Sequence, residues 1–203
     1  MKKSEITKEK ILTTAENEFS EKGLFGARID VICEKAGVNK RMIYHYFHSK
    51  EELYKTVLYG VYEKLAEYEK EYYIDVVSPD LAIKNIVYGS FRFLKANPTF
   101  VRILMWENLN NGKYLQDKDV KSVKNPTIEY IKSQIVKGQT EGIFREDVDK
   151  EQIVISLLNF EFSYFSSIHT LSNVLEMELF SESEIAKRAD FISGLLLKYL
   201  YKD

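Results

Sequence analysis

The sequence predicts an all-α protein of about nine helices, with a three-helix unit at residues 1–50 and a larger helical domain at residues 51–203. Apolar residues recur at intervals of three and four through most of the chain, which is the period of an amphipathic helix. In addition, residues 78–79, 97–98 and 125–126 are Ser-Pro or Asn-Pro pairs, and a capping residue before proline is typical of a helix start.

The composition is that of a globular chain without a membrane span. Of the 203 residues, 45% are hydrophobic and 30% are charged. No apolar run reaches the roughly 18 residues of a membrane helix, and the polar start MKKSEITKEK lacks the apolar core of a signal peptide. We therefore expect a cytoplasmic protein without a membrane partner. The single cysteine, Cys33, cannot form an internal disulfide and is expected to be a buried structural thiol.

The charge is distributed unevenly along the chain. The net charge is -2, but residues 1–50 contain ten Lys and Arg against seven Asp and Glu, which gives +3. The other residues contain 19 against 24, which gives -5. The N-terminal quarter is therefore the part suited to a polyanionic partner.

The first two helices are predicted at about 7–22 and 28–36. Ile11 and Phe19 belong to the buried stripe of the first helix, and Gly23 is expected to end it. Together with the next short helix, these segments are long enough to share one small core.

Residues 36–52, AGVNKRMIYHYFHSKEE, predict a tight turn and a helix with two different sides. Gly37 adopts the positive φ that ends one helix, and Asn39 caps the next. The packing side contains Met42, Ile43, Tyr46 and Phe47, and the opposite side contains Lys40, Arg41, Tyr44 and His45. Ser49 lies three residues before Glu52, a capping-box spacing that starts a further helix.

A helix that exposes cations after a Gly-containing turn is typical of the second helix of a helix-turn-helix, which enters the DNA major groove. Lys40 and Arg41 are predicted to contact base edges, since Arg pairs bidentately with guanine O6 and N7. Tyr44, His45 and Lys50 are predicted to hold phosphates. The alternative is a small helical hairpin whose basic side is only solvated.

These motifs resemble the DNA-binding domain of the TetR/AcrR-like transcriptional regulators. The segments GLF at 23–25, ARIDVICEKAGV at 27–38 and IYHYFHSKEEL at 43–53 occur in that family's order and spacing, and the match runs from about Thr7 to Tyr54. The resemblance implies a three-helix DNA-binding domain, a larger ligand-binding domain, a homodimer, and relief of repression by a small molecule. It also supports Tyr44 and His45 as DNA contacts.

Two further residues, Arg28 and Asn39, belong to the candidate DNA-binding set. The family commonly has a hydroxyl around residues 27–28, and here Ala27 and Arg28 provide none. We expect Arg28 to replace the phosphate contact by its charge. Asn39, the predicted cap, completes the candidate set. In a dimer the two recognition helices would lie about 34 to 36 Å apart, matching the half-sites of an inverted repeat in double-stranded DNA.

Six helices are predicted after the recognition helix. Their approximate ranges are 50–68, 79–97, 98–110, 126–141, 150–171 and 182–201, with a loop at 111–124. The last two helices are apolar over most of their surface, and a helix that is apolar on both sides must be covered on both sides. We therefore expect these two helices to form the homodimer interface.

The candidate ligand-binding residues are apolar or embedded polar side chains of the middle helices. Polar groups in apolar surroundings are informative because their burial requires a partner. The set is Phe91, Phe100, Ile103, Trp106, Glu107, Tyr130, Glu161, Phe162, Phe165 and His169. The alternative for the apolar members is plain core packing, and Glu161 and His169 are equally consistent with pairing across a dimer.

Enzymatic motifs are missing from the sequence. It has no glycine-rich phosphate loop and no cysteine cluster, and it contains three histidines. We expect no catalytic site, cofactor or metal. The prediction is a homodimeric DNA-binding regulator, a repressor released from an inverted-repeat operator by an unknown small molecule; no residue separates repressor from activator. The competing class is a helical small-molecule-binding or interaction protein that binds no DNA, and a helical enzyme is a third.

Overall fold

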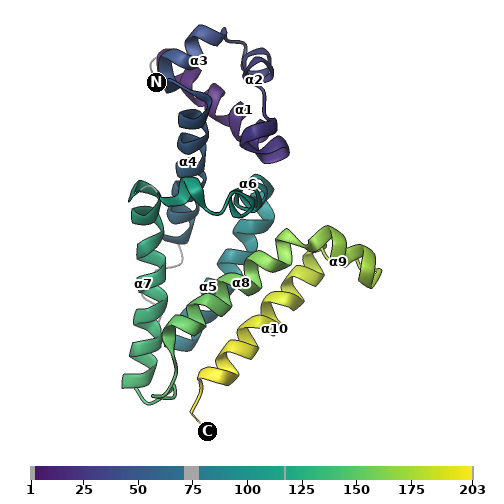
Figure 1. Cartoon of the computed structure of the whole chain (residues 1–203). Coiled ribbons are helices and arrows are strands. Elements are labelled where there is room, and N and C mark those ends of the chain that lie inside the picture. The colour runs from purple at the N-terminus through teal and green to yellow at the C-terminus, as the bar shows by residue number, and fades with distance from the viewer. Residues whose placement is uncertain (1–2, 71–77, 117, 203) are drawn as a thin grey trace. The chain divides into compact units, whose positions relative to one another are not determined.

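A computed structural model describes residues 3–70, 78–116 and 118–202. These residues form ten α-helices and one 3-10 helix, η1 (Figure 1). The α-helices are α1 (Lys3–Gly26), α2 (Ile29–Ala36), α3 (Lys40–Phe47), α4 (Lys50–Lys70), α5 (Pro79–Ala96), α6 (Pro98–Leu109), α7 (Lys118–Thr140), α8 (Lys150–Ser166), α9 (Ile168–Leu175) and α10 (Glu182–Leu200), and η1 is Lys113–Gln116. The prediction of an all-α fold is confirmed.

The chain divides into two compact units that are not contiguous in sequence. Unit 1 comprises residues 1–64 and 98–121, and unit 2 comprises residues 65–97 and 122–203. Helix α6 therefore packs with the N-terminal helices, although it follows α5 of unit 2 in the chain. The functional division into residues 1–50 and 51–203 stays a prediction, because compactness does not tell where DNA or a ligand binds.

The core of unit 1 forms around α1. Ile11, Ala15 and Phe19 on α1 are fully buried, as the periodicity predicted. The Phe19 ring meets the buried ring of Tyr54 on α4 edge-on, with 5.1 Å between the ring centroids. Helix α1 continues past its predicted end to Gly26, but Gly23 is non-helical, with φ 65 and ψ 177. Gly23 thus interrupts α1 rather than ending it.

Polar contacts hold α6 in unit 1. The indole Nε1 of Trp106 donates to the Ser20 carbonyl oxygen at 3.2 Å, and Thr99 Oγ1 donates to Glu16 Oε1 at 2.6 Å. The fully buried Glu107 carboxylate accepts from Tyr54 Oη at 3.1 Å and from the Tyr114 backbone N–H at 2.5 Å. These contacts join α6 to both α1 and α4.

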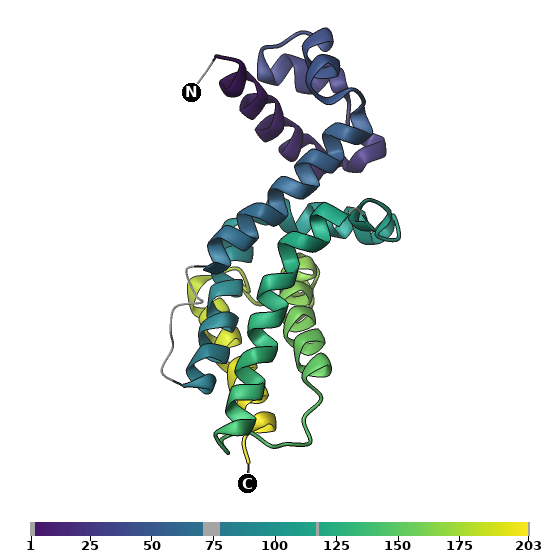
Figure 2. The ribbon, with the colours of Figure 1, turned by 90° about the vertical axis from the view of Figure 1, so that its left-hand side faces the viewer.

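Unit 2 is built on α5, α8 and α10, which pack on one another (Figure 2). The Phe91 ring of α5 lies against Tyr164 and Phe165 of α8, with centroids 5.7 and 5.6 Å apart. Side-chain caps fix the starts of α8 and α10: Asp149 accepts from Glu151 and Gln152 N–H groups, and Ser181 accepts from Glu184 N–H. The helix starts predicted at Pro79 and Pro98 are confirmed.

The predicted loop at 111–124 and the predicted helix start at residues 125–126 are wrong. Helix α7 already begins at Lys118, and Pro126 lies inside it. Proline removes one backbone donor and crowds the carbonyl four residues earlier, so its penalty is local. Helix α7 therefore continues on both sides of Pro126.

The single helix predicted at 150–171 is also wrong, because α8 ends at Ser166 and α9 starts at Ile168. Ser167 between them has φ -108 and ψ 5, and both its backbone N–H and its hydroxyl donate to the Ser163 carbonyl oxygen. Serine hydroxyls compete in this way with the regular helical hydrogen bonds. The spacing of apolar residues carries no information about this competition, so it predicted one continuous helix.

None of the helices built from the described residues combines the length and apolar character needed to span a bilayer.

Candidate DNA-binding site

The turn between α2 and α3 has the predicted geometry. Gly37 ends α2 with a φ of 67, and its N–H donates to the carbonyl oxygens of Cys33 and Glu34. Asn39 is in extended conformation, and its side-chain oxygen accepts from the Met42 N–H at 3.0 Å. This cap satisfies one of the backbone donors left free at a helix start and fixes where α3 begins.

Helix α3 has a buried side and an exposed polar side, as predicted. Ile43 and Phe47 are buried against unit 1, with 0% and 3% of their surface exposed. The exposed side carries Lys40, Arg41, Tyr44 and His45. Since a helix backbone is rigid and the buried side seats it, the four polar side chains project together into solvent.

The cations of α3 are held weakly by the protein itself. Lys40 Nζ lies 3.1 Å from Asp30 Oδ1, and this hydrogen bond raises the pKa of Lys40. Both side chains are exposed, and an exposed ion pair contributes little to stability. Within residues 3–70, 78–116 and 118–202, Arg41 makes no hydrogen bond or ion pair. Both cations can therefore contact an external anion at small cost.

Lys50 lies at the start of α4 and is half-buried. Its Nζ donates to the Phe25 carbonyl oxygen at 3.4 Å, and burial lowers its pKa. At this site a phosphate contact would replace a long hydrogen bond to a neutral carbonyl.

The start of α2 uses a carboxylate where the family commonly has a hydroxyl. Arg28 is the cap residue and makes no side-chain cap, but its backbone N–H donates to Glu18 Oε1 at 3.3 Å. Glu18 is 5% exposed and also lies 3.6 Å from Lys35 Nζ. The Arg28 side chain is exposed and remains available to a phosphate. Glu18 was not predicted as a partner of this cap, because it precedes Arg28 by ten residues.

Cys33 on α2 is half-buried, so the prediction of a buried thiol is wrong in degree. Burial, with a contribution from Asp30, raises its pKa, and the reactive thiolate is disfavoured. Among the described residues, no three His, Cys, Asp or Glu side chains are grouped as metal ligands.

The ten candidate ligand residues are divided between the two units. Phe100, Ile103, Trp106 and Glu107 belong to unit 1; Phe91, Tyr130, Glu161, Phe162, Phe165 and His169 belong to unit 2. The Glu107 carboxylate already accepts two hydrogen bonds within unit 1. His169 was expected to be embedded in apolar surroundings, but on α9 it is exposed, because the break at Ser167 redirects the chain.

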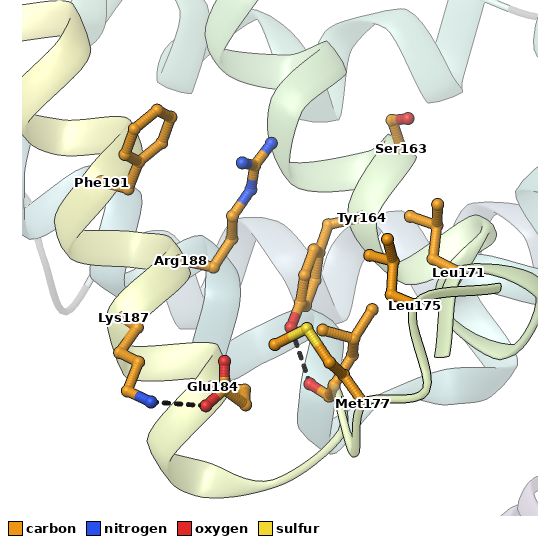
Figure 3. Close-up of a pocket in the computed structure, with 10 residues that line it drawn as sticks. Ser163, Tyr164, Leu171, Leu175, Met177, Glu184, Lys187, Arg188 and Phe191 are labelled. Atoms are coloured by element: carbon orange, nitrogen blue, oxygen red, sulfur yellow. Dashed lines mark hydrogen bonds and ion pairs between the residues drawn. The ribbon is translucent and has the colours of Figure 1, made fainter. Parts of the chain in front are cut away.

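Unit 2 contains a cavity that the sequence did not predict, which we call the α9 cavity (Figure 3). Its volume is about 480 Å³, and residues of α8, α9, α10 and the α9–α10 connection line it. None of the ten candidate ligand residues belongs to its lining. The apolar run after Ser167, which includes Leu171 and Leu175, is the feature of the sequence from which this cavity could have been predicted.

The capped turn and the exposed cationic side of α3 define a helix-turn-helix DNA-binding protein. Residues 11–57 match the family described as "Bacterial regulatory proteins, tetR family", and residues 79–195 match "Tetracyclin repressor-like, C-terminal domain". The chain therefore belongs to the TetR family of bacterial transcriptional regulators.

Curated relatives and solved structures match between 74% and 100% of this chain. The HTH-type transcriptional repressor NicS of Pseudomonas putida is 32% identical over 195 residues, covering 96% of this chain and 92% of NicS. RutR of Escherichia coli K12 is 28% identical over 150 residues, covering 74% and 69%. A TetR regulator from Chloroflexus aurantiacus has a TM-score of 0.78 at 19% identity over 100% of both chains. FadR of Bacillus subtilis, solved in complex with stearoyl-CoA, has a TM-score of 0.72 at 14% identity, covering 95% and 99%.

Proposed function

We propose that the chain is a homodimeric repressor that binds an inverted-repeat operator through α3 of each subunit and is released by a small molecule. The observation that carries this proposal is the exposed polar side of α3, seated by Ile43 and Phe47. The similarity to NicS, which is named a repressor, and to FadR, which was solved with stearoyl-CoA, supports repression and a ligand.

The side chains of the interface divide into base contacts and phosphate contacts. Lys40 and Arg41 lie in the first turn of α3, the part of a recognition helix that contacts base edges. Tyr44, His45 and Lys50 lie farther along and hold phosphates. Two further residues, Arg28 and Asn39, flank this group. The Asn39 oxygen is used by its cap, so its amide NH₂ is the group left to donate.

The dimer forms through α8 and α10, on sides that remain apolar and exposed. Phe191, Leu195 and Tyr199 of α10 are spaced by four residues and are 60%, 45% and 51% exposed. Ile155 of α8 is 49% exposed. Because residues four apart share one side of a helix, Phe191, Leu195 and Tyr199 form a continuous strip on the side of α10 away from its buried residues. A second copy that covers this strip removes it from water.

The DNA part of the proposal is tested by selecting duplexes from a randomised pool and measuring their affinity at fixed salt. We expect an inverted repeat to be enriched. Arg41→Ala should weaken binding to it by about 1 to 3 kcal/mol and relax the preference at one base position. Arg102→Ala is the matched control, because Arg102 is an equally charged, exposed residue on α6 outside the interface. Unchanged affinity and preference in Arg41→Ala would exclude Arg41 as a base contact.

The ligand part is tested by a thermal-shift screen, followed by release of the selected duplex. A ligand at 100 times its dissociation constant adds about 2.7 kcal/mol to the free energy of unfolding. We expect a stabilising compound to lower DNA affinity. A compound that stabilises the protein and leaves DNA affinity unchanged is a ligand without an effector role. Transcription from a promoter that overlaps the selected site then separates repressor from activator.

A further inference from the structure

The α9 cavity has the size and the lining of a small-molecule site. Its volume of about 480 Å³ falls within the range of roughly 300 to 1,000 Å³ that is common for such sites. The apolar part of its lining is Tyr164, Leu171, Leu175, Met177, Leu179 and Phe191. Figure 3 shows the guanidinium of Arg188 between Phe191 and Tyr164, with Leu171, Leu175 and Met177 on the other side of the Tyr164 ring. The cavity thus combines an apolar wall with the guanidinium of Arg188.

Arg188 is held by aromatic rings but lacks an acceptor. Its guanidinium carbon lies 5.9 Å from the Tyr164 ring centroid and 5.6 Å from that of Phe191. Its Nε is buried, and among the residues that the structure describes it has no hydrogen-bond partner. A buried donor without an acceptor is costly, and more so when it belongs to a charged group. Since Nε itself is enclosed, the positively charged guanidinium is expected to take an anionic acceptor at its outer nitrogens.

Glu184, Lys187 and the Tyr164 hydroxyl, which also line the cavity, are already paired. Lys187 Nζ lies 2.6 Å from Glu184 Oε1, so these two opposite charges offset each other. The Tyr164 hydroxyl donates to the Leu179 carbonyl oxygen at 2.7 Å. Arg188 is consequently the one charge of the lining without a counter-charge among the described residues.

We propose that the α9 cavity binds an apolar small molecule that carries one carboxylate. The carboxylate accepts hydrogen bonds from the Arg188 guanidinium, whose fork of N–H groups matches a carboxylate in geometry. The apolar body lies along Leu171, Leu175 and Met177. The site lies wholly within unit 2, so binding does not require DNA and is a separate property from the proposed repressor function.

The competing occupant is a side chain of a second copy. Phe191 lines the cavity and also belongs to the exposed side of α10 that the proposed dimer buries. If a partner carboxylate pairs with Arg188, removal of the guanidinium weakens dimerisation. If a free carboxylate pairs with it, removal weakens ligand binding and leaves dimerisation unchanged.

The experiment is isothermal titration calorimetry of the full chain with decanoate at submicellar concentration. Decanol provides the same chain without the charge, and acetate provides the charge without the chain. We expect decanoate to bind at least about tenfold more tightly than decanol, with no detectable binding of acetate. Arg188→Gln should lose about tenfold or more in decanoate affinity, and Arg188→Lys should lose less because it keeps the charge.

Two further variants complete the test. Arg92→Gln removes the same charge from an exposed position on α5 outside the cavity and should bind decanoate as the wild type does. Leu175→Trp places a large side chain at the cavity from a position that is 54% exposed, so it should abolish binding without unfolding α9. Circular dichroism and the melting temperature of each variant establish that it is folded.

Three results would overturn the proposal. They are equal binding of decanoate and decanol, unchanged decanoate binding in Arg188→Gln, and weaker dimerisation of Arg188→Gln in a chain that binds no decanoate. The last result assigns the cavity to a second copy. Because DNA affinity is measured separately on the ligand-free chain, a failure of the repressor function does not alter the outcome of this titration.

Discussion

Helices α3 and α10 are both amphipathic, but their exposed sides differ in chemistry. Helix α3 exposes Lys40 and Arg41, whereas α10 exposes Phe191 and Leu195. Cations attract a polyanion and release its counterions, so their contribution falls as salt rises. Apolar surface associates because it leaves water, and salt screening has little influence on that term. The exposed side of α3 is therefore suited to the proposed DNA contact, and that of α10 to the proposed contact with a second subunit.

The two helices also differ in how they are stabilised. Helix α3 has eight residues and α10 has 19. A helix of eight residues is unstable alone, so α3 depends on its Asn39 cap and on its buried side. Helix α10 has seven buried residues distributed along five turns and withstands a change on its exposed side. Substitutions on α10 should therefore alter assembly and leave the fold intact.

The largest effect is expected from Leu195→Glu on α10. In a two-fold interface the substitution occurs twice, and each copy buries a charge where an apolar side chain was. The dimer dissociation constant should rise at least about 100-fold, and the melting temperature of the subunit should change little. Sedimentation velocity measures the first quantity. Ala186→Glu is the control, because Ala186 is exposed and, nine residues before Leu195, lies on the opposite side of the same helix. Unchanged sedimentation of Leu195→Glu would place the interface elsewhere.

Gly23→Ala should destabilise unit 1 without altering dimerisation. A Cβ at Gly23 would lie 2.8 Å from ring atoms of Trp106, and the backbone has φ 65 with ψ 177, a region that is nearly restricted to glycine. We expect a loss of roughly 1 to 3 kcal/mol in chemical unfolding. Gly60→Ala on α4 is the control, because a Cβ there meets nothing within 4 Å. Equal stability of the two variants would contradict the contact between Trp106 and Gly23.

Asn39→Ala should remove the cap of α3 and cost about 1 kcal/mol of folding free energy. Its effect on DNA affinity should be larger than its effect on dimerisation, because α3 belongs to unit 1 and the proposed dimer strip lies on α10 of unit 2. Urea unfolding and DNA titration measure the two quantities. Asn39→Ser retains a capping oxygen, and its failure to restore stability would show that the cap contributes nothing.

The smallest effect is expected from Lys50→Gln. This lysine donates a long hydrogen bond to the Phe25 carbonyl oxygen, and its loss should weaken all duplexes about equally. The slope of log affinity against log salt should decrease by about 1. A change in sequence preference instead would make Lys50 a base contact.

Local signals in the sequence predicted much of this fold. The caps at Asn39, Asp149 and Ser181 involve backbone groups two or three residues away, so their residue types are sufficient to recognise them. The two sides of α3 follow from helical spacing in the same way. The predictions at Pro126 and Ser167 were wrong because residue type alone does not decide whether a helix continues there. At Pro126 the helix continues despite the lost backbone donor, and at Ser167 it breaks where the hydroxyl bonds the Ser163 carbonyl oxygen.

Contacts between segments that are distant in the sequence could not be predicted from it. Trp106 bonds Ser20 across 86 positions, and Glu18 caps α2 from α1. No local pattern specifies either pair, because both follow from how the helices pack. The α9 cavity is a further example, since it requires the break at Ser167 that places Leu171 and Leu175 opposite Arg188.

We infer that α3 associates with DNA through charge and that α8 and α10 associate with a second subunit through apolar surface. The most direct test measures both equilibria on the wild-type chain as salt rises from about 50 to 200 mM. For six to ten phosphate contacts, affinity for the selected inverted repeat should fall by about 10³ to 10⁵. Over the same range the dimer dissociation constant should stay nearly constant. A DNA affinity that does not change with salt would exclude binding through charge, and a dimer that dissociates as salt rises would exclude an apolar interface.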